Sequence, residues 1–114
     1  MGLEVAFQSR ELRTTCESPA RAKRELGEAA SAALRRHLAD LEAVETAAEL
    51  LEMGLGFENC ARRLGLVRFH LIDGLYLYCE VNHRNVPLSG EQVDWRKVTR
   101  LKVVDIGSVN DALC

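Results

Sequence analysis

Apolar and polar side chains alternate most clearly between residues 66 and 81, in two runs that flank Asp73 and Gly74. Both runs are rich in β-branched and aromatic residues, and an Asp-Gly pair between such runs predicts a β-hairpin. The period of two assigns side chains to the two faces of each strand. One face holds the apolar residues, which are Val67, Phe69, Leu71, Leu75, Leu77, Cys79 and Val81.

The register of this hairpin follows from the requirement that its apolar residues share one face of the sheet. A two-residue loop at Asp73 and Gly74 would pair Leu71 with Tyr76 and would mix apolar and polar side chains. A three-residue loop with a left-handed Gly74 pairs Leu71 with Leu75, and the apolar residues then agree. We therefore expect one open, polar face that carries Arg68, His70, Tyr76, Tyr78 and Glu80.

Two further strands and a loop are predicted outside the hairpin. Residues 3–7 alternate as in a short strand, and residues 98–106 form a strand that is apolar on both sides, as in the centre of a sheet. Residues 82–91 hold a proline and a glycine without periodicity, which predicts a surface loop. We expect Trp95 to anchor the far end of this loop.

Helices are predicted between the first strand and the hairpin. Ser18 and Pro19 form a helix start, and Thr46 with Glu49 has the capping-box spacing. The predicted helices cover residues 9–16, 18–26, 28–43 and 46–53. This order predicts a single α+β domain over residues 1–114, with helices packed on one face of a mostly antiparallel sheet.

Composition limits the class of protein. The chain has 114 residues, of which 47% are hydrophobic and 28% charged, and this excludes a disordered chain. It contains neither a signal peptide nor an apolar run of the roughly 20 residues that cross a bilayer, so we expect a cytoplasmic protein without membrane contact. The net charge of −2 means that any nucleic-acid site must be a local patch.

The cysteines predict neither a disulfide nor a metal site. Cys16, Cys60, Cys79 and Cys114 show no CxxC or other metal-ligand spacing. In a cytoplasmic chain they are expected to be reduced thiols, with Cys79 in the core and Cys114 at a loose terminus.

Short segments along nearly the whole chain resemble the HigB-type killer proteins of the RelE/ParE superfamily of bacterial toxins. The resemblance depends on the order and spacing of these segments together. They are residues 5–16 (VAFQSRELRTTC), 23–27 (KRELG), 63–65 (RLG), 76–80 (YLYCE), 94–99 (DWRKVT) and 104–107 (VDIG).

The resemblance implies a RelE/ParE-like toxin domain, a helix-turn-helix antitoxin as partner, and action on mRNA in the ribosomal A site. Active members cut mRNA without a metal or other cofactor, by attack of a ribose 2′-oxygen on the adjacent phosphate. That reaction needs a base, an acid and cations that stabilise the phosphorane.

The chain departs from the family pattern at its catalytic positions. Phe57 and Cys60 stand where the family has a His and a Lys, and Tyr76 stands where it has an Arg. Residues 108–110 replace the usual terminal Asp-Tyr-His. Two hypotheses therefore remain: a ribosome-dependent endoribonuclease, or a toxin-like module that binds an antitoxin or RNA without cleaving it.

The candidate site residues follow from the hairpin and from the resemblance. His70 could transfer a proton or could be a hydrogen-bonded residue of the sheet surface. Tyrosines can stack on bases but are also common in strands, and basic residues can hold phosphates or form a solvated surface. The catalytic candidates are Arg63, Arg68, His70 and Tyr76, and the RNA-binding candidates are Arg62, Tyr78, Arg21, Lys23 and Arg24.

Overall fold

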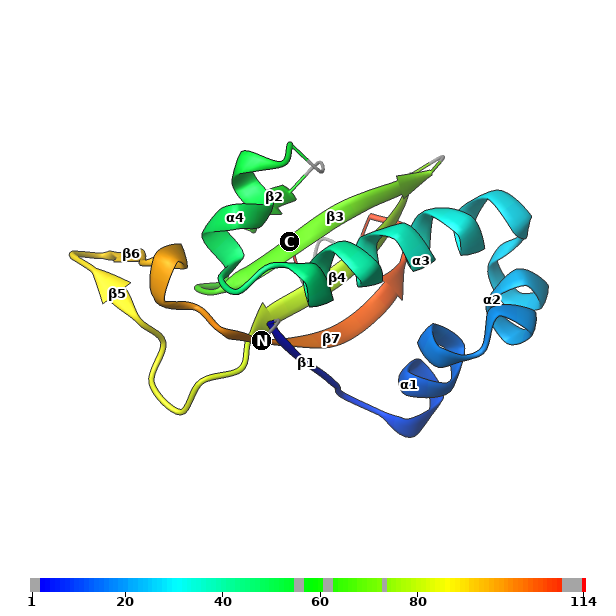
Figure 1. The fold of residues 1–114 in the computed structure, drawn as a ribbon, viewed down its shortest axis with the longest axis horizontal. Coiled ribbons are helices and arrows are strands. Elements are labelled where there is room, and N and C mark those ends of the chain that lie inside the picture. Colours follow the sequence, from blue (N-terminus) through cyan, green and yellow to red (C-terminus); the bar gives the residue numbers. More distant parts are fainter. Residues whose placement is uncertain (1–2, 55–56, 61–62, 73, 110–113) are drawn as a thin grey trace.

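The computed structural model describes residues 3–54, 57–60, 63–72, 74–109 and 114. Along the chain, four α-helices follow the first strand and precede all the other strands (Figure 1). The elements are β1 (Glu4–Phe7), α1 (Arg10–Glu17), α2 (Pro19–Leu26), α3 (Glu28–Ala43), α4 (Ala47–Glu52), β2 (Phe57–Asn59), β3 (Leu66–Ile72), β4 (Leu75–Val81), β5 (Leu88–Ser89), β6 (Gln92–Val93), the 3-10 helix η1 (Trp95–Lys97) and β7 (Arg100–Gly107).

The main sheet has five strands in the order β1-β7-β4-β3-β2. Only β1 and β7 run parallel, and the other neighbours are antiparallel. The fold is therefore α+β with a mostly antiparallel sheet, as predicted. In Figure 1, α3 crosses one face of this sheet, with α1 and α2 at one end and α4 at the other.

Helix α3 covers the sheet because its apolar residues recur at helical spacing. Its observed bounds, Glu28–Ala43, are those that the sequence predicts. Ala33, Leu34 and Leu41 are buried in the main core together with Phe69 and Leu77 of the hairpin. The apolar faces of helix and hairpin therefore meet, as the hairpin pattern requires.

The hairpin register is confirmed over most of its length. Phe69 pairs with Leu77, as the three-residue loop requires, and Gly74 has a left-handed φ of 79°. The predicted three-residue loop and its pair of Leu71 with Leu75 are wrong, because Ile72 pairs with Leu75, as in the rejected two-residue loop. A register shift between His70 and Ile72 restores the expected pairing from His70 onward. The extra residue on β3 is a bulge, and it lets the strand enter the turn while Leu71 stays buried.

The predicted surface loop after the hairpin contains additional structure. Strand β5 pairs with β6 across a turn at Gly90, where φ is 67°, so residues 82–91 are not wholly irregular. The two strands have two residues each, too few to give an alternation that the sequence could reveal. Trp95 anchors the far end of this segment, as expected, by packing edge-on against Phe57 with ring centroids 5.2 Å apart.

A second, smaller cluster covers part of the sheet face opposite α3. It consists of buried Cys60, Leu66, Tyr78 and Val104, with Tyr76 and Cys114 packed against it. Cys60 and Cys114 form a disulfide, so the expectation of four reduced thiols is wrong, as is that of a loose Cys114. The two residues are 54 positions apart, and no local spacing could indicate that the fold brings them together.

The capping box at the start of α4 predicts an acid-sensitive helix. The Glu49 carboxylate accepts the backbone N–H groups of Glu45 and Thr46 at 2.6 and 3.0 Å. These bonds, that of Thr46 first, lower the pKa of Glu49 below its ordinary value of 4.5. Because the folded state favours the ionised form of Glu49, this carboxylate stabilises the fold above pH 4.5. The stabilisation is lost as the pH falls through the lowered pKa.

We expect Glu49→Gln to remove this part of the pH dependence of unfolding. Urea denaturation of the wild type and the variant between pH 7 and acid measures it, and the two stability curves should converge as the pH falls. Glu52→Gln, at the end of the same helix, is the matched control. Curves for Glu49→Gln and wild type that stay parallel down to low pH would contradict the capping role.

Candidate functional site

The polar face of the hairpin brings three of the predicted site residues together. Arg68 lies opposite Tyr78 and His70 lies opposite Tyr76 in the β3–β4 register. The Cζ atom of Arg68 lies 4.2 Å from the centroid of the Tyr76 ring, which is a cation–π geometry. The His70 and Tyr76 rings pack edge-on, 5.5 Å apart. Arg68, His70 and Tyr76 are therefore adjacent, as the register argument predicts.

A fourth residue, Glu58, completes this cluster. Strand β2 pairs with β3 so that Glu58 lies beside Arg68, and Arg68 Nε donates to Glu58 Oε2 at 2.7 Å. The pKa of Arg68 is raised, mainly by this bond and further by a bond with Tyr78, so the side chain stays cationic. The Glu58 side chain is 50% exposed, whereas that of Arg68 is 18% exposed. We call Glu58, Arg68, His70 and Tyr76 the Arg68 cluster.

The sequence does not indicate Glu58 as a site residue, because β2 has only three residues. The run Phe57-Glu58-Asn59 shows no alternation, because half-buried Phe57 is followed by two exposed polar residues. A run of three residues is too short to distinguish a strand from a loop. Only the pairing of β2 with β3 indicates that Glu58 and Arg68 meet.

Arg63 lies in a separate ion-pair network. Its Nη2 is 2.9 Å from Glu80 Oε2, and Lys102 Nζ is 3.1 Å from Glu80 Oε1. Glu80 on β4 thus joins the segment before β3 to β7. Arg63 remains 55% exposed, so its guanidinium can still reach a ligand. Arg62 lies outside the described residues.

Tyr78 does not belong to an exposed surface, and the prediction that it faces solvent is wrong. Its side chain is fully buried in the second cluster, and its hydroxyl donates to the Ser108 carbonyl at 2.8 Å. The alternation assigns Tyr78 to the correct side of the sheet, but Ser108 and Cys114, which follow β7, lie over its side chain. Tyr78 therefore cannot stack on a base as predicted, and among the described tyrosines only Tyr76 retains partial exposure.

The basic residues of α2 are on a different element. Arg21 pairs with Glu25 at 2.8 Å and Lys23 lies 3.8 Å from Glu28, while Arg24 is exposed. Helix α2 packs against α1 and α3. Arg21, Lys23 and Arg24 are thus at least partly exposed on one helix, and their contact with RNA stays a prediction.

His37 connects α3 to the strand that carries the cluster. Its Nε2 is 2.9 Å from the carbonyl oxygen of His70, and its ring packs on Phe69 with centroids 5.8 Å apart. Because a carbonyl only accepts, Nε2 carries the proton and donates. This bond is made at the residue where the hairpin register shifts.

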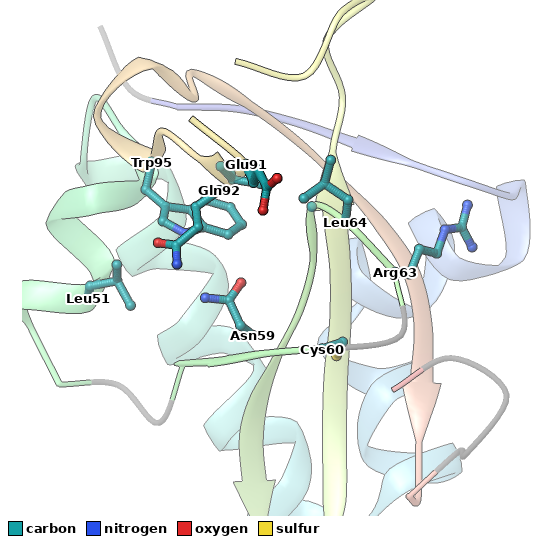
Figure 2. Close-up of a pocket in the computed structure, with 10 residues that line it drawn as sticks. Leu51, Asn59, Cys60, Arg63, Leu64, Glu91, Gln92 and Trp95 are labelled. Atoms are coloured by element: carbon teal, nitrogen blue, oxygen red, sulfur yellow. The ribbon is translucent and has the colours of Figure 1, made fainter. Parts of the chain in front are cut away.

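A cleft of about 480 Å³ lies near the cluster but is not lined by it. Figure 2 shows Trp95, Gln92 and Asn59 grouped on one side of this cleft, with Leu64 and Arg63 across from them. Its wall is formed by Leu51, Asn59, Cys60, Arg63, Leu64, Gly65, Glu91, Gln92, Val93 and Trp95. The Arg68 cluster is thus a surface site, which suits a polymeric ligand better than a small molecule.

Comparisons with known proteins identify no relative: a scan against protein-family models, a search of curated proteins and a search of solved structures each find no match. Among the described residues, no group of three or more His, Cys, Asp and Glu side chains could hold a metal ion. In the same part of the chain, no helix has the length and apolar character needed to cross a membrane.

Proposed function

We propose that this chain is a RelE/ParE-like toxin of the HigB type, from a bacterial type II toxin–antitoxin pair, and that it cuts ribosome-bound mRNA. The observation that carries this proposal is the Arg68 cluster, in which a carboxylate, a guanidinium and an imidazole share one sheet face. Its expected partners are a helix-turn-helix antitoxin, the ribosome and mRNA. Its expected location is the cytoplasm, where ribosomes are, although the Cys60–Cys114 disulfide is unusual for that reducing compartment.

The cluster contains the groups that metal-independent RNA cleavage requires. Glu58 would accept the proton of the ribose 2′-hydroxyl as its oxygen attacks the adjacent phosphorus. Arg68 would stabilise the charge of the phosphorane, and His70 would give a proton to the departing 5′-oxygen. The products are a 2′,3′-cyclic phosphate and a free 5′-hydroxyl.

Tyr76 and Arg63 would support this reaction without transferring protons. The Tyr76 ring lies against both Arg68 and His70 and fixes their relative positions. Arg63 is partly exposed beside Glu80 and could contact the RNA backbone. In this proposal, Arg68 and Arg63 take the place of the family's cationic residues, which are absent here because Phe57, Cys60 and Tyr76 stand at their positions.

Mapping of mRNA 5′ ends in cells that express the chain without its partner tests this function. We expect codon-phased cuts with 5′-hydroxyl ends. His70→Ala or Glu58→Gln should reduce the cleavage rate about 10²- to 10⁴-fold, which is the usual contribution of one general acid or base to a reaction rate. Arg84→Ala, an exposed arginine of the segment after the hairpin, is the control and should leave the cuts unchanged. Cuts that persist in both cluster variants would refute the assignment of the site.

A second candidate function is a toxin-like module that binds its antitoxin or RNA without cleavage. It is favoured by the ion pairs of both candidate cations, because Glu58 neutralises Arg68 and Glu80 neutralises Arg63. The net charge of −2 points the same way, since RNA-binding chains usually carry excess positive charge. Antitoxin binding without any mRNA cuts would support this alternative.

A further inference from the structure

The Cys60–Cys114 disulfide connects the cleft to the sheet face that carries the candidate site. Cys60 follows β2 directly, two positions after Glu58 of the Arg68 cluster, and it lines the cleft. Cys114 and Tyr76 both pack against the second cluster. A disulfide is unusual in the reducing compartment that we expect for this chain, and cytosolic disulfides are mostly transient or redox-sensing. The bond is therefore a candidate for opening and closing in the folded protein.

The cleft gives a small thiol a route to this bond. Its volume of about 480 Å³ lies within the range of about 300–1,000 Å³ that sites for small molecules occupy. Cys60 lines the cleft but is only 4% exposed, so a reagent that reaches it must be small enough to enter. Two side-chain amides, those of Asn59 and Gln92, also line the cleft and can bond to peptide groups (Figure 2).

The charges of the cleft match a small peptide that carries charges of both signs. Arg63 is 55% exposed, and its partner Glu80 also holds Lys102 at 3.1 Å. Arg63 can therefore turn to a carboxylate of a ligand while Lys102 continues to compensate Glu80. Glu91 lines the same cleft, is exposed, and can accept an ammonium group of the ligand.

We infer that Cys60 and Cys114 form a thiol-exchange site for a small peptide thiol with carboxylate and ammonium groups, which enters by the cleft. The thiolate of the ligand attacks the sulfur of Cys60, the bond between the two cysteines breaks, and Cys114 leaves as a thiolate that takes a proton from water. A second ligand thiolate then attacks the ligand sulfur of the mixed disulfide and releases Cys60 as a thiolate. The two ligand thiols are thereby oxidised to a disulfide, and the protein disulfide is reduced.

Opening of the bond uncovers part of the sheet face beside the Arg68 cluster. Tyr78 is fully buried in the second cluster, against which the disulfide holds Cys114. The Tyr76 and Tyr78 rings lie 6.2 Å apart, and Tyr76 in turn lies against Arg68. With Cys114 released, Tyr78 gains exposure next to Tyr76 and the polar face of the hairpin widens. This step rests on the proposed function for what the widened face binds, whereas the exchange itself does not.

Mass spectrometry of the full chain in glutathione buffers tests the exchange, because glutathione is a peptide thiol with carboxylates and an ammonium group. We expect most chains to lose the disulfide in an excess of reduced glutathione while they stay folded, and an early acid quench should trap glutathione on Cys60. Arg63→Gln should slow the reaction about two- to fivefold, the usual contribution of an exposed ion pair. It should not slow the reaction of the cationic thiol cysteamine. Arg84→Gln, an exposed arginine outside the described lining of the cleft, is the matched control.

NMR of the chain labelled in its tyrosine rings tests the uncovering of Tyr78. A soluble paramagnetic probe should broaden the Tyr78 signal in the reduced chain and not in the oxidised one, with partly exposed Tyr76 as the internal reference. Cys114→Ser should show the broadened signal with or without glutathione. Should this variant unfold, the reduced wild type still decides the question.

Three results would overturn the inference: a disulfide that resists glutathione until the chain unfolds, glutathione trapped on Cys114, or a Tyr78 signal that reduction leaves unchanged. None of these measurements involves RNA. A chain that opens in glutathione but makes no mRNA cuts would therefore refute the proposed cleavage and support the exchange site.

Discussion

Replacement of Cys114 by serine is expected to lower the free energy of unfolding by about 4 kcal/mol, because it opens a long covalent loop. The disulfide joins Cys114 to Cys60 across 54 positions of sequence, and loop-closure entropy rises with that separation. Cys60 also directly follows β2, which carries Glu58. Loss of the bond therefore loosens both the second cluster and the end of the strand that pairs Glu58 with Arg68.

Urea denaturation with and without a reductant measures this contribution. Reduction should destabilise the wild type and leave Cys114→Ser unchanged. Cys16→Ser is the matched control, since Cys16 is a free, half-buried thiol. Burial, with a smaller contribution from Glu17, raises the pKa of Cys16 to about 11, so it stays protonated and slow to react at neutral pH. A wild type as stable in reductant as without it would contradict the structural role of the disulfide.

The sequence predicts the parts of the fold that depend on neighbouring residues. The period of two in the hairpin identified the pairing of Phe69 with Leu77 and the side of the sheet on which Arg68 and His70 lie. The spacing of apolar residues in α3 predicted its bounds. In both cases burial of one face determines the register, and a one-residue slip would expose the whole apolar set.

The burial of Tyr78 and the Cys60–Cys114 disulfide are not predicted by the sequence, because each depends on residues far apart in the chain. Tyr78 is buried because Ser108, 30 residues later, accepts its hydroxyl hydrogen bond and Cys114 packs against the same cluster. Neither contact changes the alternation of apolar and polar residues in the hairpin sequence. For the same reason the sequence indicates an arginine and a histidine of the candidate site but not Glu58, which reaches Arg68 only through a three-residue edge strand.

Phe69→Ala is expected to cost about 3–5 kcal/mol of stability, since it removes a large buried ring from the main core. Phe69 is 1% exposed, and its ring packs against Phe57 with centroids 5.3 Å apart and against His37 at 5.8 Å. The ring therefore joins β2 and α3 to the hairpin. Its loss leaves a cavity between three elements that cannot all close on it, which places the cost in the upper part of the range.

His70→Ala is the matched control, because it changes the adjacent residue on the opposite face of the same strand. His70 is exposed, and the carbonyl that accepts from His37 is kept in the variant, so we expect a change within about 0.5 kcal/mol. Thermal and urea unfolding of both variants measures the difference. If both variants lost a similar amount of unfolding free energy, the strand would not be buried on the Phe69 side alone. A large cost for Phe69→Ala beside a stable His70→Ala would assign any loss of RNA cleavage in the latter to chemistry rather than to unfolding.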